Sequence, residues 1–186
     1  MNRTDDQLIH RYLQGDMDAF AALYGRYACR LMAFLQSLGA DGATAEELAQ
    51  AAWLKAIEAL PRYRPRGRFR AWLFQVAHRT WLDDVRSARE RRRMHTPELA
   101  SLADCAAQRT NGGPRSPAEM AEEEEQDRRL EAALSALPRD MREVILLRLD
   151  GELTFREIAR QTGAPLGTVL WRAREARQRL TRLLEE

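Results

Sequence analysis

The chain has 186 residues, of which 45% are hydrophobic and 31% are charged, and its net charge is +2. This composition fits one medium or two small folded domains, and no apolar run approaches the ~20 residues that cross a bilayer. The polar, acidic N-terminus is not a secretory signal, and Cys29 and Cys105 share no metal-ligand spacing. We therefore expect a cytoplasmic protein with reduced thiols, without membrane insertion, and with no metal or cofactor.

The charges are strongly segregated along the chain. Residues 1–61 have a net charge of −3, whereas residues 62–93 contain 11 arginines against three acidic residues, a net charge of +8. Residues 119–131 have a net charge of −5, and residues 132–186 return to +2. Such blocks create local electric fields that attract polyanions and partner proteins, so they indicate a function that depends on electrostatics.

The first part of the chain has the apolar spacing of helices, and no convincing strand is found anywhere. Thr4 followed by Gln7 is expected to cap a short first helix, and Asp16 is expected to cap a second one. After a break at residues 40–44, Thr44 with Glu47 predicts the start of a third helix that runs to about residue 60.

An arginine-rich loop at residues 61–68 precedes a long helix that is expected to run from about Phe69 to Arg93. Arginines alternate with aromatic residues here, a pattern that suits single-stranded or opened nucleic acid, because cations neutralise the backbone while bases stack on rings. The alternative is that Phe69 and Trp72 belong to the core and that the arginines form a solvated face. The candidate contacts of this segment are Tyr63, Arg68, Phe69, Trp72, Arg79, Arg86, Arg89 and Arg93.

Residues 94–118 lose helical periodicity, and NGGPRSP at 111–117 is the clearest linker signal in the chain. Ser116, Pro117 and Glu119 then predict a new helix start. We therefore expect an all-α protein with two small helical domains, 1–93 and 119–186, joined by a flexible linker. The acidic stretch that opens the second domain either stabilises its helix N-terminus or screens the arginines of the first domain.

The second domain ends in a predicted helix-turn-helix. Thr154 with Glu157 forms a capping box, and Gly163 tolerates the positive φ of a tight turn. Pro165 can open the next helix, where Val169 is expected to be buried. From Arg172 onward that helix is strongly basic, which suits a helix in a DNA major groove. The alternative is an ordinary helical hairpin with a solvated basic face.

With these motifs together, the chain resembles the extracytoplasmic-function group of bacterial RNA polymerase sigma factors. Residues 15–35, 45–60 and 69–93 resemble the second conserved region of that group, and residues 137–180 resemble the fourth. The resemblance implies a factor that binds core RNA polymerase and promoter DNA to direct initiation, is not an enzyme, and is controlled by an anti-sigma factor.

The resemblance also implies roles for particular residues. The helix at 45–60 would dock on core RNA polymerase through Glu47, Gln50 and Leu54. The loop at 63–69 and the following helix would read and open the minus-ten element, using the candidate contacts given above. The last helix would read the minus-thirty-five element with Thr168, Leu170, Trp171, Arg172, Arg174 and Arg177.

Five positions depart from the pattern of the group. Arg79 stands where it commonly has asparagine, and Glu175 stands where it frequently has arginine. Ala51 stands where the group often has glutamate, and Leu170 and Trp171 stand where it usually has a basic residue and serine. The promoter sequence therefore does not follow from that of relatives.

Two other functions are compatible with parts of this pattern. A stand-alone regulator could bind operators through the helix-turn-helix, but it would not need residues 45–93. A resolvase or transposase fragment would need a catalytic cluster, and the adjacent Asp83 and Asp84 point about 100° apart on a helix, so they are poor co-ligands of a metal.

Overall fold

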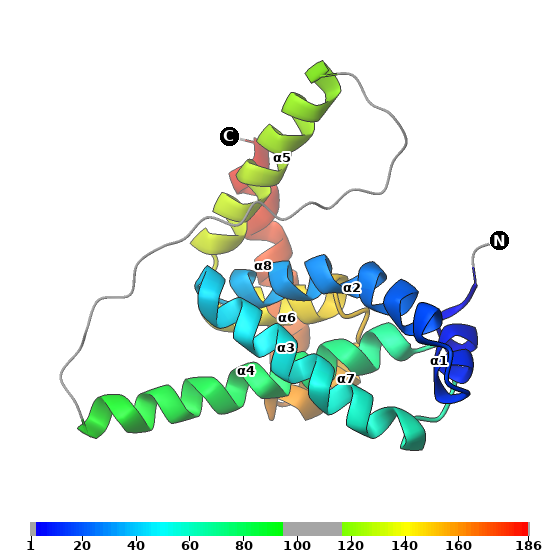
Figure 1. Cartoon of the computed structure of the whole chain (residues 1–186). Coiled ribbons are helices and arrows are strands. Elements are labelled where there is room, and N and C mark those ends of the chain that lie inside the picture. Colours follow the sequence, from blue (N-terminus) through cyan, green and yellow to red (C-terminus); the bar gives the residue numbers. More distant parts are fainter. Residues whose placement is uncertain (1–2, 95–116, 186) are drawn as a thin grey trace. The chain divides into compact units, whose positions relative to one another are not determined.

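A computed structural model describes residues 3–94 and 117–185, with side chains at residues 3–88 and 125–185. Every regular element in these ranges is a helix, and the chain divides into two compact units (Figure 1). The first unit contains α1 (Asp5–Leu13), α2 (Met17–Ser37), α3 (Gly42–Ala59), the 3-10 helix η1 (Leu60–Arg62) and α4 (Phe69–Met94). The second contains α5 (Pro117–Ala136), α6 (Arg139–Leu149), α7 (Phe155–Thr162) and α8 (Leu166–Glu185). The all-α prediction is confirmed.

Two of the three predicted N-caps in the first unit are confirmed. Thr4 and Gln7 form the reciprocal capping box of α1, in which the backbone N–H of Gln7 donates to the Thr4 hydroxyl at 3.3 Å. Asp16 caps α2 by accepting from the backbone N–H of Ala19, a bond that lowers the pKa of Asp16.

The start of α3 was predicted wrongly. Its N-cap is Asp41, whose Oδ1 accepts from the backbone N–H of Thr44 at 2.9 Å. Thr44 therefore lies inside the first turn. Aspartate and threonine are both good N-caps, and in this helix Asp41 takes that position.

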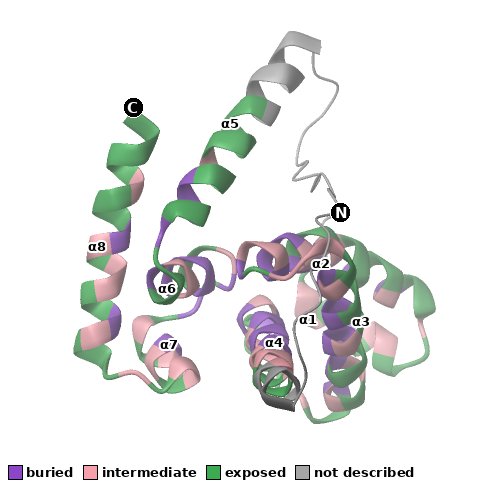
Figure 2. Ribbon diagram, turned by 90° about the vertical axis from the view of Figure 1, so that its left-hand side faces the viewer, coloured by how far each residue is buried: buried purple, intermediate pink, exposed green. Residues whose placement is uncertain are grey.

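The core of the first unit forms where α2 packs against α1, α3 and α4. The rings of Phe34 on α2 and Phe74 on α4 meet edge-on, with centroids 5.0 Å apart. Leu23 and Leu31 on the same face of α2 are fully buried. Figure 2 shows the buried residues along the inward faces of these helices. This packing leaves the outer faces of α3 and α4 exposed.

The second unit contains the predicted helix-turn-helix, formed by α7 and α8. Thr154 and Glu157 make the capping box of α7, and Gly163 ends that helix with φ of +71°. Ile158 and Val169 are fully buried where the two helices cross. α8 also packs against α5 and α6, so three helices hold it and its remaining face is exposed.

The acidic stretch of α5 is described only in part. Glu125 pairs with Arg128 of the same helix at 3.0 Å. Glu122, Glu123 and Glu124 lie outside the described side chains, as does the predicted cap Ser116. Screening of the arginines at 62–93 by these acids stays a prediction.

Candidate nucleic-acid and protein interfaces

The outer face of α3 carries a stripe of exposed residues, Glu47, Gln50 and Leu54, spaced three and four positions apart. Residues at this spacing share one side of a helix. Leu54 exposes 64% of its surface, whereas its neighbour Trp53 is buried at 4%. An exposed leucine between polar residues suits contact with another protein, because such a contact removes its apolar surface from water.

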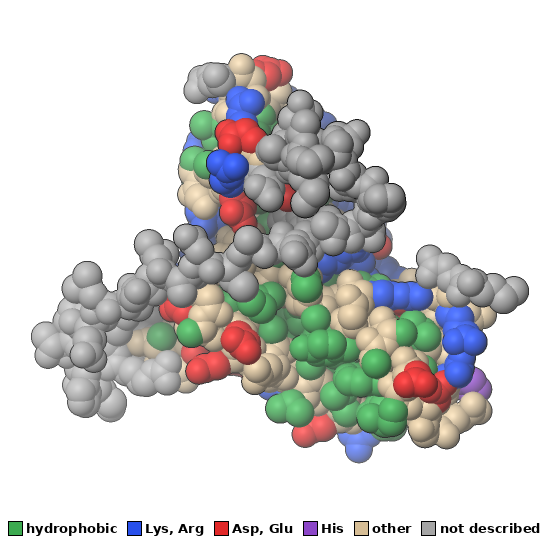
Figure 3. Space-filling model, turned by 45° about the horizontal axis from the view of Figure 1, so that its top comes forward, with side chains coloured by type: hydrophobic (Ala, Val, Ile, Leu, Met, Phe, Trp, Pro, Cys, Tyr) green, Lys and Arg blue, Asp and Glu red, His purple; other side chains and the backbone are tan. Residues whose placement is uncertain are grey.

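Aromatic surface lies beside this stripe and was not predicted from the sequence. Tyr24 on α2 is 44% exposed, and its ring centroid is 5.1 Å from that of Trp53 on α3. The first unit also exposes Leu13 and Met17, and Figure 3 shows hydrophobic side chains gathered on one face of this unit. Tyr24 lies four residues after Phe20 and three before Tyr27, so helical spacing places it on the apolar side of α2 and gave no sign of its exposure.

The arginine-rich loop at residues 61–68, which begins within η1 and ends at α4, presents a basic surface. Its exposed arginines are Arg62, Arg64, Arg66 and Arg68. Tyr63 and Trp72 are half-buried, with ring centroids 5.1 Å apart, so an edge of this aromatic pair reaches solvent. The loop thus combines cations with accessible rings, as contact with unpaired bases requires.

Phe69 requires a correction. It is 1% exposed, and its ring packs between those of Tyr27, Trp53, Tyr63 and Trp72. It is therefore a core residue and cannot stack on a base. The alternating arginine and aromatic pattern did not separate the two roles, because a core aromatic at a helix start has the same sequence spacing as a stacking one.

The exposed face of α4 carries Arg79 and Arg86, seven residues apart, so they lie two turns apart on one side of the helix. Arg86 forms a long ion pair, 3.7 Å, with Asp83 of its own helix. His78 and Thr80 beside this stripe are buried. Arg89 and Arg93 lie beyond the side chains that the structure describes.

The outward face of α8 carries Leu170 and Trp171, which are 45% and 58% exposed. Arg174 and Arg177 are exposed as well, and Thr168 is half-buried. At 100° per residue, Trp171, Arg174 and Gln178 fall within a narrow sector of the helix. Gln178 is exposed and was not among the predicted contacts, although its amide could both donate and accept.

Arg172 lies on a different side of α8. Its Nη2 donates to Oδ2 of Asp140 on α6 at 2.5 Å, and its side chain is 22% exposed. This ion pair joins α8 to α6, whereas Arg179 pairs with Glu175 of its own helix. This position favours a packing role.

The described residues contain no group of three or more His, Cys, Asp or Glu side chains that could hold a metal ion. Within the same ranges, no helix has the length and apolar character needed to cross a membrane. Cys29 is an exposed free thiol, and Cys105 lies outside the described residues.

Comparison with known proteins agrees with this arrangement. Residues 23–91 match the family model of Sigma-70 region 2, and residues 127–180 match that of Sigma-70 region 4. The chain is 33% identical over 178 residues to the RNA polymerase sigma factor CarQ of Myxococcus xanthus, with 96% of each chain covered. It is 31% identical over 185 residues to the ECF RNA polymerase sigma factor RpoE of Cereibacter sphaeroides, with 96% of this chain and 94% of the relative covered.

A solved structure is similar as well. The sigma factor RpoE of Bartonella quintana, in complex with the anti-sigma factor NepR, superposes with a TM-score of 0.60 at 27% identity, covering 83% of this chain and 89% of that one. The chain therefore belongs to the extracytoplasmic-function family of RNA polymerase sigma factors, which direct promoter-specific initiation of transcription.

Proposed function

We propose that the two units divide the work of this sigma factor. The outer face of α3, with Glu47, Gln50 and Leu54, docks on core RNA polymerase. The arginine-rich loop and the exposed face of α4 bind the minus-ten element, and the outward face of α8 binds the minus-thirty-five element. Residues 94–118 serve as the linker between the two DNA-binding units.

One observation carries this proposal. The first unit presents both the exposed stripe on α3, which contains Leu54, and a row of exposed arginines that leads into α4. A stand-alone regulator would bind its operator through α7 and α8 and would need neither surface. A protein that must hold a polymerase while it binds opened DNA needs both.

The partners follow from the same division. We propose an anti-sigma factor as a further partner, since the similar sigma factor of Bartonella quintana is bound to one in its solved structure. The protein needs no catalytic group of its own, because the polymerase makes the phosphodiester bonds. It acts in the cytoplasm, where polymerase and promoter DNA are found.

Reconstitution tests the proposal. The purified chain is mixed with core RNA polymerase, and the complex is used to select initiating sequences from a randomised promoter library. Binding to core together with specific run-off transcripts from the selected promoters is the expected result. Sequence-specific DNA binding by the chain alone, without binding to core, would instead support the stand-alone regulator.

A further inference from the structure

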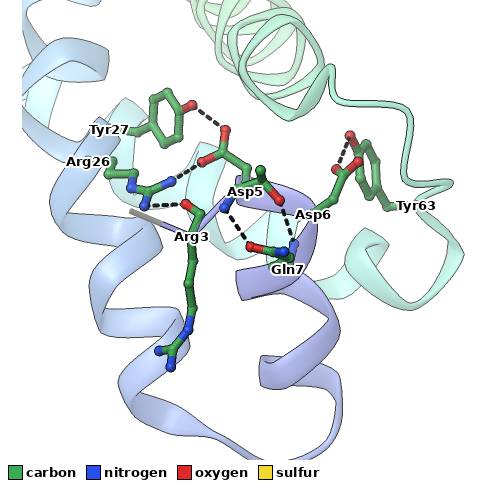
Figure 4. Close-up of polar contacts among 8 residues, drawn as sticks. Arg3, Asp5, Asp6, Gln7, Arg26, Tyr27 and Tyr63 are labelled. Atoms are coloured by element: carbon green, nitrogen blue, oxygen red, sulfur yellow. Dashed lines mark hydrogen bonds and ion pairs between the residues drawn. The ribbon is translucent and has the colours of Figure 1, made fainter. Parts of the chain in front are cut away.

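Two neighbouring aspartates in the first turn of α1 point to opposite sides (Figure 4). Asp5 faces α2, where its Oδ1 accepts from Nη1 of Arg26 at 2.7 Å and its Oδ2 accepts from the hydroxyl of Tyr27 at 2.5 Å. Asp6 faces the arginine-rich loop instead. The first turn of α1 therefore connects α2 to the arginine-rich loop, in which Tyr63 lies 57 residues after Asp6 in the chain.

Asp6 holds that loop at two points. Its Oδ2 accepts from the backbone N–H of Gly67 at 2.7 Å, and its Oδ1 lies 3.4 Å from the hydroxyl of Tyr63, which donates to it. Gly67 has φ of +65°, a left-handed conformation that favours glycine. One carboxylate thus fixes both the beginning of the loop and its turn.

The tyrosines bound by the two aspartates pack against the same ring, that of Phe69. Tyr27, held by Asp5, packs edge-on against Phe69 with ring centroids 5.7 Å apart, and Tyr63, held by Asp6, packs against the same ring at 5.9 Å. Tyr63 also contacts Trp72, the partly exposed ring at the start of α4. The hydrogen bonds of α1 and the packing around Phe69 therefore select the same placement of the loop.

We infer that Asp6 is a positioning residue for promoter opening: it holds the arginine-rich loop and Tyr63 in the conformation that receives unpaired minus-ten DNA. This inference rests on the proposed role of the loop. An untethered loop would lose conformational freedom on binding, and that entropy opposes the interaction. A loop already fixed by Asp6 loses less of it, so the bound conformation forms more readily.

Loss of Asp6 is not expected to unfold the unit. Asp5 still ties α1 to Arg26 and Tyr27, and Leu8 and Ile9 of α1 are buried at 3% and 1% exposure. Asp6→Ala therefore tests the tether by itself. Asp6→Asn keeps one acceptor oxygen without the charge. Gly67→Ala keeps the carboxylate and strains the turn through its positive φ alone, because a Cβ there meets no atom within 4 Å.

The experiment uses the variant factors bound to core RNA polymerase and a promoter selected by the unaltered holoenzyme. Opening is followed by the fluorescence of a 2-aminopurine base placed in the minus-ten element, and affinity for core is measured in parallel. We expect Asp6→Ala to reduce opening roughly five- to tenfold, because two hydrogen bonds to a partly exposed carboxylate are lost, with core affinity unchanged. Asp6→Asn should reduce opening less than Asp6→Ala does, and Gly67→Ala should reduce opening as well.

Two controls separate the possible causes of a defect. Asp18→Ala removes an exposed acid from the first turn of α2 and should leave opening unchanged, which excludes a general helix-end effect. Asp6→Ala in a Tyr63→Phe background should add less than it does alone, because the two residues share a bond. A purely structural role would give additive losses that follow the melting temperature.

The failure of each idea is distinguishable. If Arg66→Ala with Arg68→Ala abolishes opening while Asp6→Ala opens normally, the positioning role is wrong and the proposed function of the loop stands. If the double arginine variant opens normally, the loop itself has been assigned wrongly. Faster opening or tighter DNA binding by Asp6→Ala would mean that the carboxylate repels DNA, which also overturns the inference.

Discussion

Arg172 of α8 and Asp140 of α6 form an ion pair at 2.5 Å between residues 32 positions apart in the chain. The pair ties the recognition helix to the first turn of α6, where a negative charge also suits the helix macrodipole. Arg172 is thereby held away from the sector that Trp171 and Arg174 occupy. Arg172, the first arginine of α8, is therefore a weaker candidate for reading bases than Trp171 or Arg174.

The Arg172–Asp140 pair leads to a stability prediction. Because Asp140 is 60% exposed, Arg172→Ala should lower the free energy of unfolding by at most about 1 kcal/mol. The preferred minus-thirty-five sequence should not change. Urea unfolding and promoter selection with the variant holoenzyme measure both quantities. A changed base preference at any one position would show that Arg172 leaves Asp140 to contact DNA.

The α3 stripe predicts a defect in assembly. Gln50→Ala combined with Leu54→Ala should weaken binding to core RNA polymerase roughly tenfold or more, since an exposed leucine at the centre of an interface contributes by being desolvated there. The fold should be unaffected, because exposed substitutions of this kind change stability by about 0.5 kcal/mol or less. Fluorescence anisotropy of labelled factor titrated with core measures the affinity.

Cys29→Ala is the control for this pair, because Cys29 is exposed on another helix, α2. It should bind core as the unaltered chain does. Equal affinity of the double variant and the control would remove α3 from the docking surface.

Trp171 predicts an altered promoter preference. An exposed indole on the outward face of α8 offers apolar contact, as with a thymine methyl group, and a single N–H donor. Trp171→Ser should therefore change the selected minus-thirty-five sequence at one or two positions, each by about 1–3 kcal/mol of discrimination. Leu184→Ala, an exposed apolar residue near the end of the same helix, should leave the selected sequence unchanged.

Local signals predicted local structure well. The capping boxes of α1 and α7 and the positive φ of Gly163 are each determined within a few residues, so their sequence patterns were sufficient. The start of α3 failed because Asp41 and Thr44 offer competing caps three residues apart. Which acceptor wins depends on where the preceding turn ends, and the pattern did not contain that information.

The candidate sites were predicted only as far as exposure follows from helical spacing. The stripe on α3 was predicted from the resemblance to the sigma factor family, because helical spacing alone did not separate the exposed Leu54 from the buried apolar residues of the same helix. The burial of Phe69 could not, because it depends on rings contributed by α2 and α3. The contacts of Asp6 with Gly67 and of Arg172 with Asp140 join distant segments, and only the packed fold brings these residues together.

The tyrosines held by α1 predict loss of stability in alkali. Burial, followed by the nearby charge of Asp6, raises the pKa of Tyr63 to about 12, and burial with the bond to Asp5 raises the pKa of Tyr27 as well. An unfolded tyrosine has a pKa of about 10. Below that pH both the folded and the unfolded chain keep the tyrosine protons, so these two residues contribute no pH dependence to the free energy of unfolding. Between about pH 10 and 12 the unfolded chain loses the proton while the folded chain keeps it, and stability must fall.

Tyr63→Phe and Tyr27→Phe should each remove part of this alkaline loss, and the double variant should remove more than either. Urea unfolding at a series of pH values from neutral to strongly alkaline gives the slope, and the ultraviolet absorbance of phenolate reports ionisation directly. Tyr24→Phe is the control, since Tyr24 is 44% exposed on the same unit. An alkaline slope that is the same in the Tyr63→Phe and Tyr24→Phe variants would mean that the hydroxyl of Tyr63 is not held in the environment formed by Asp6 and the loop.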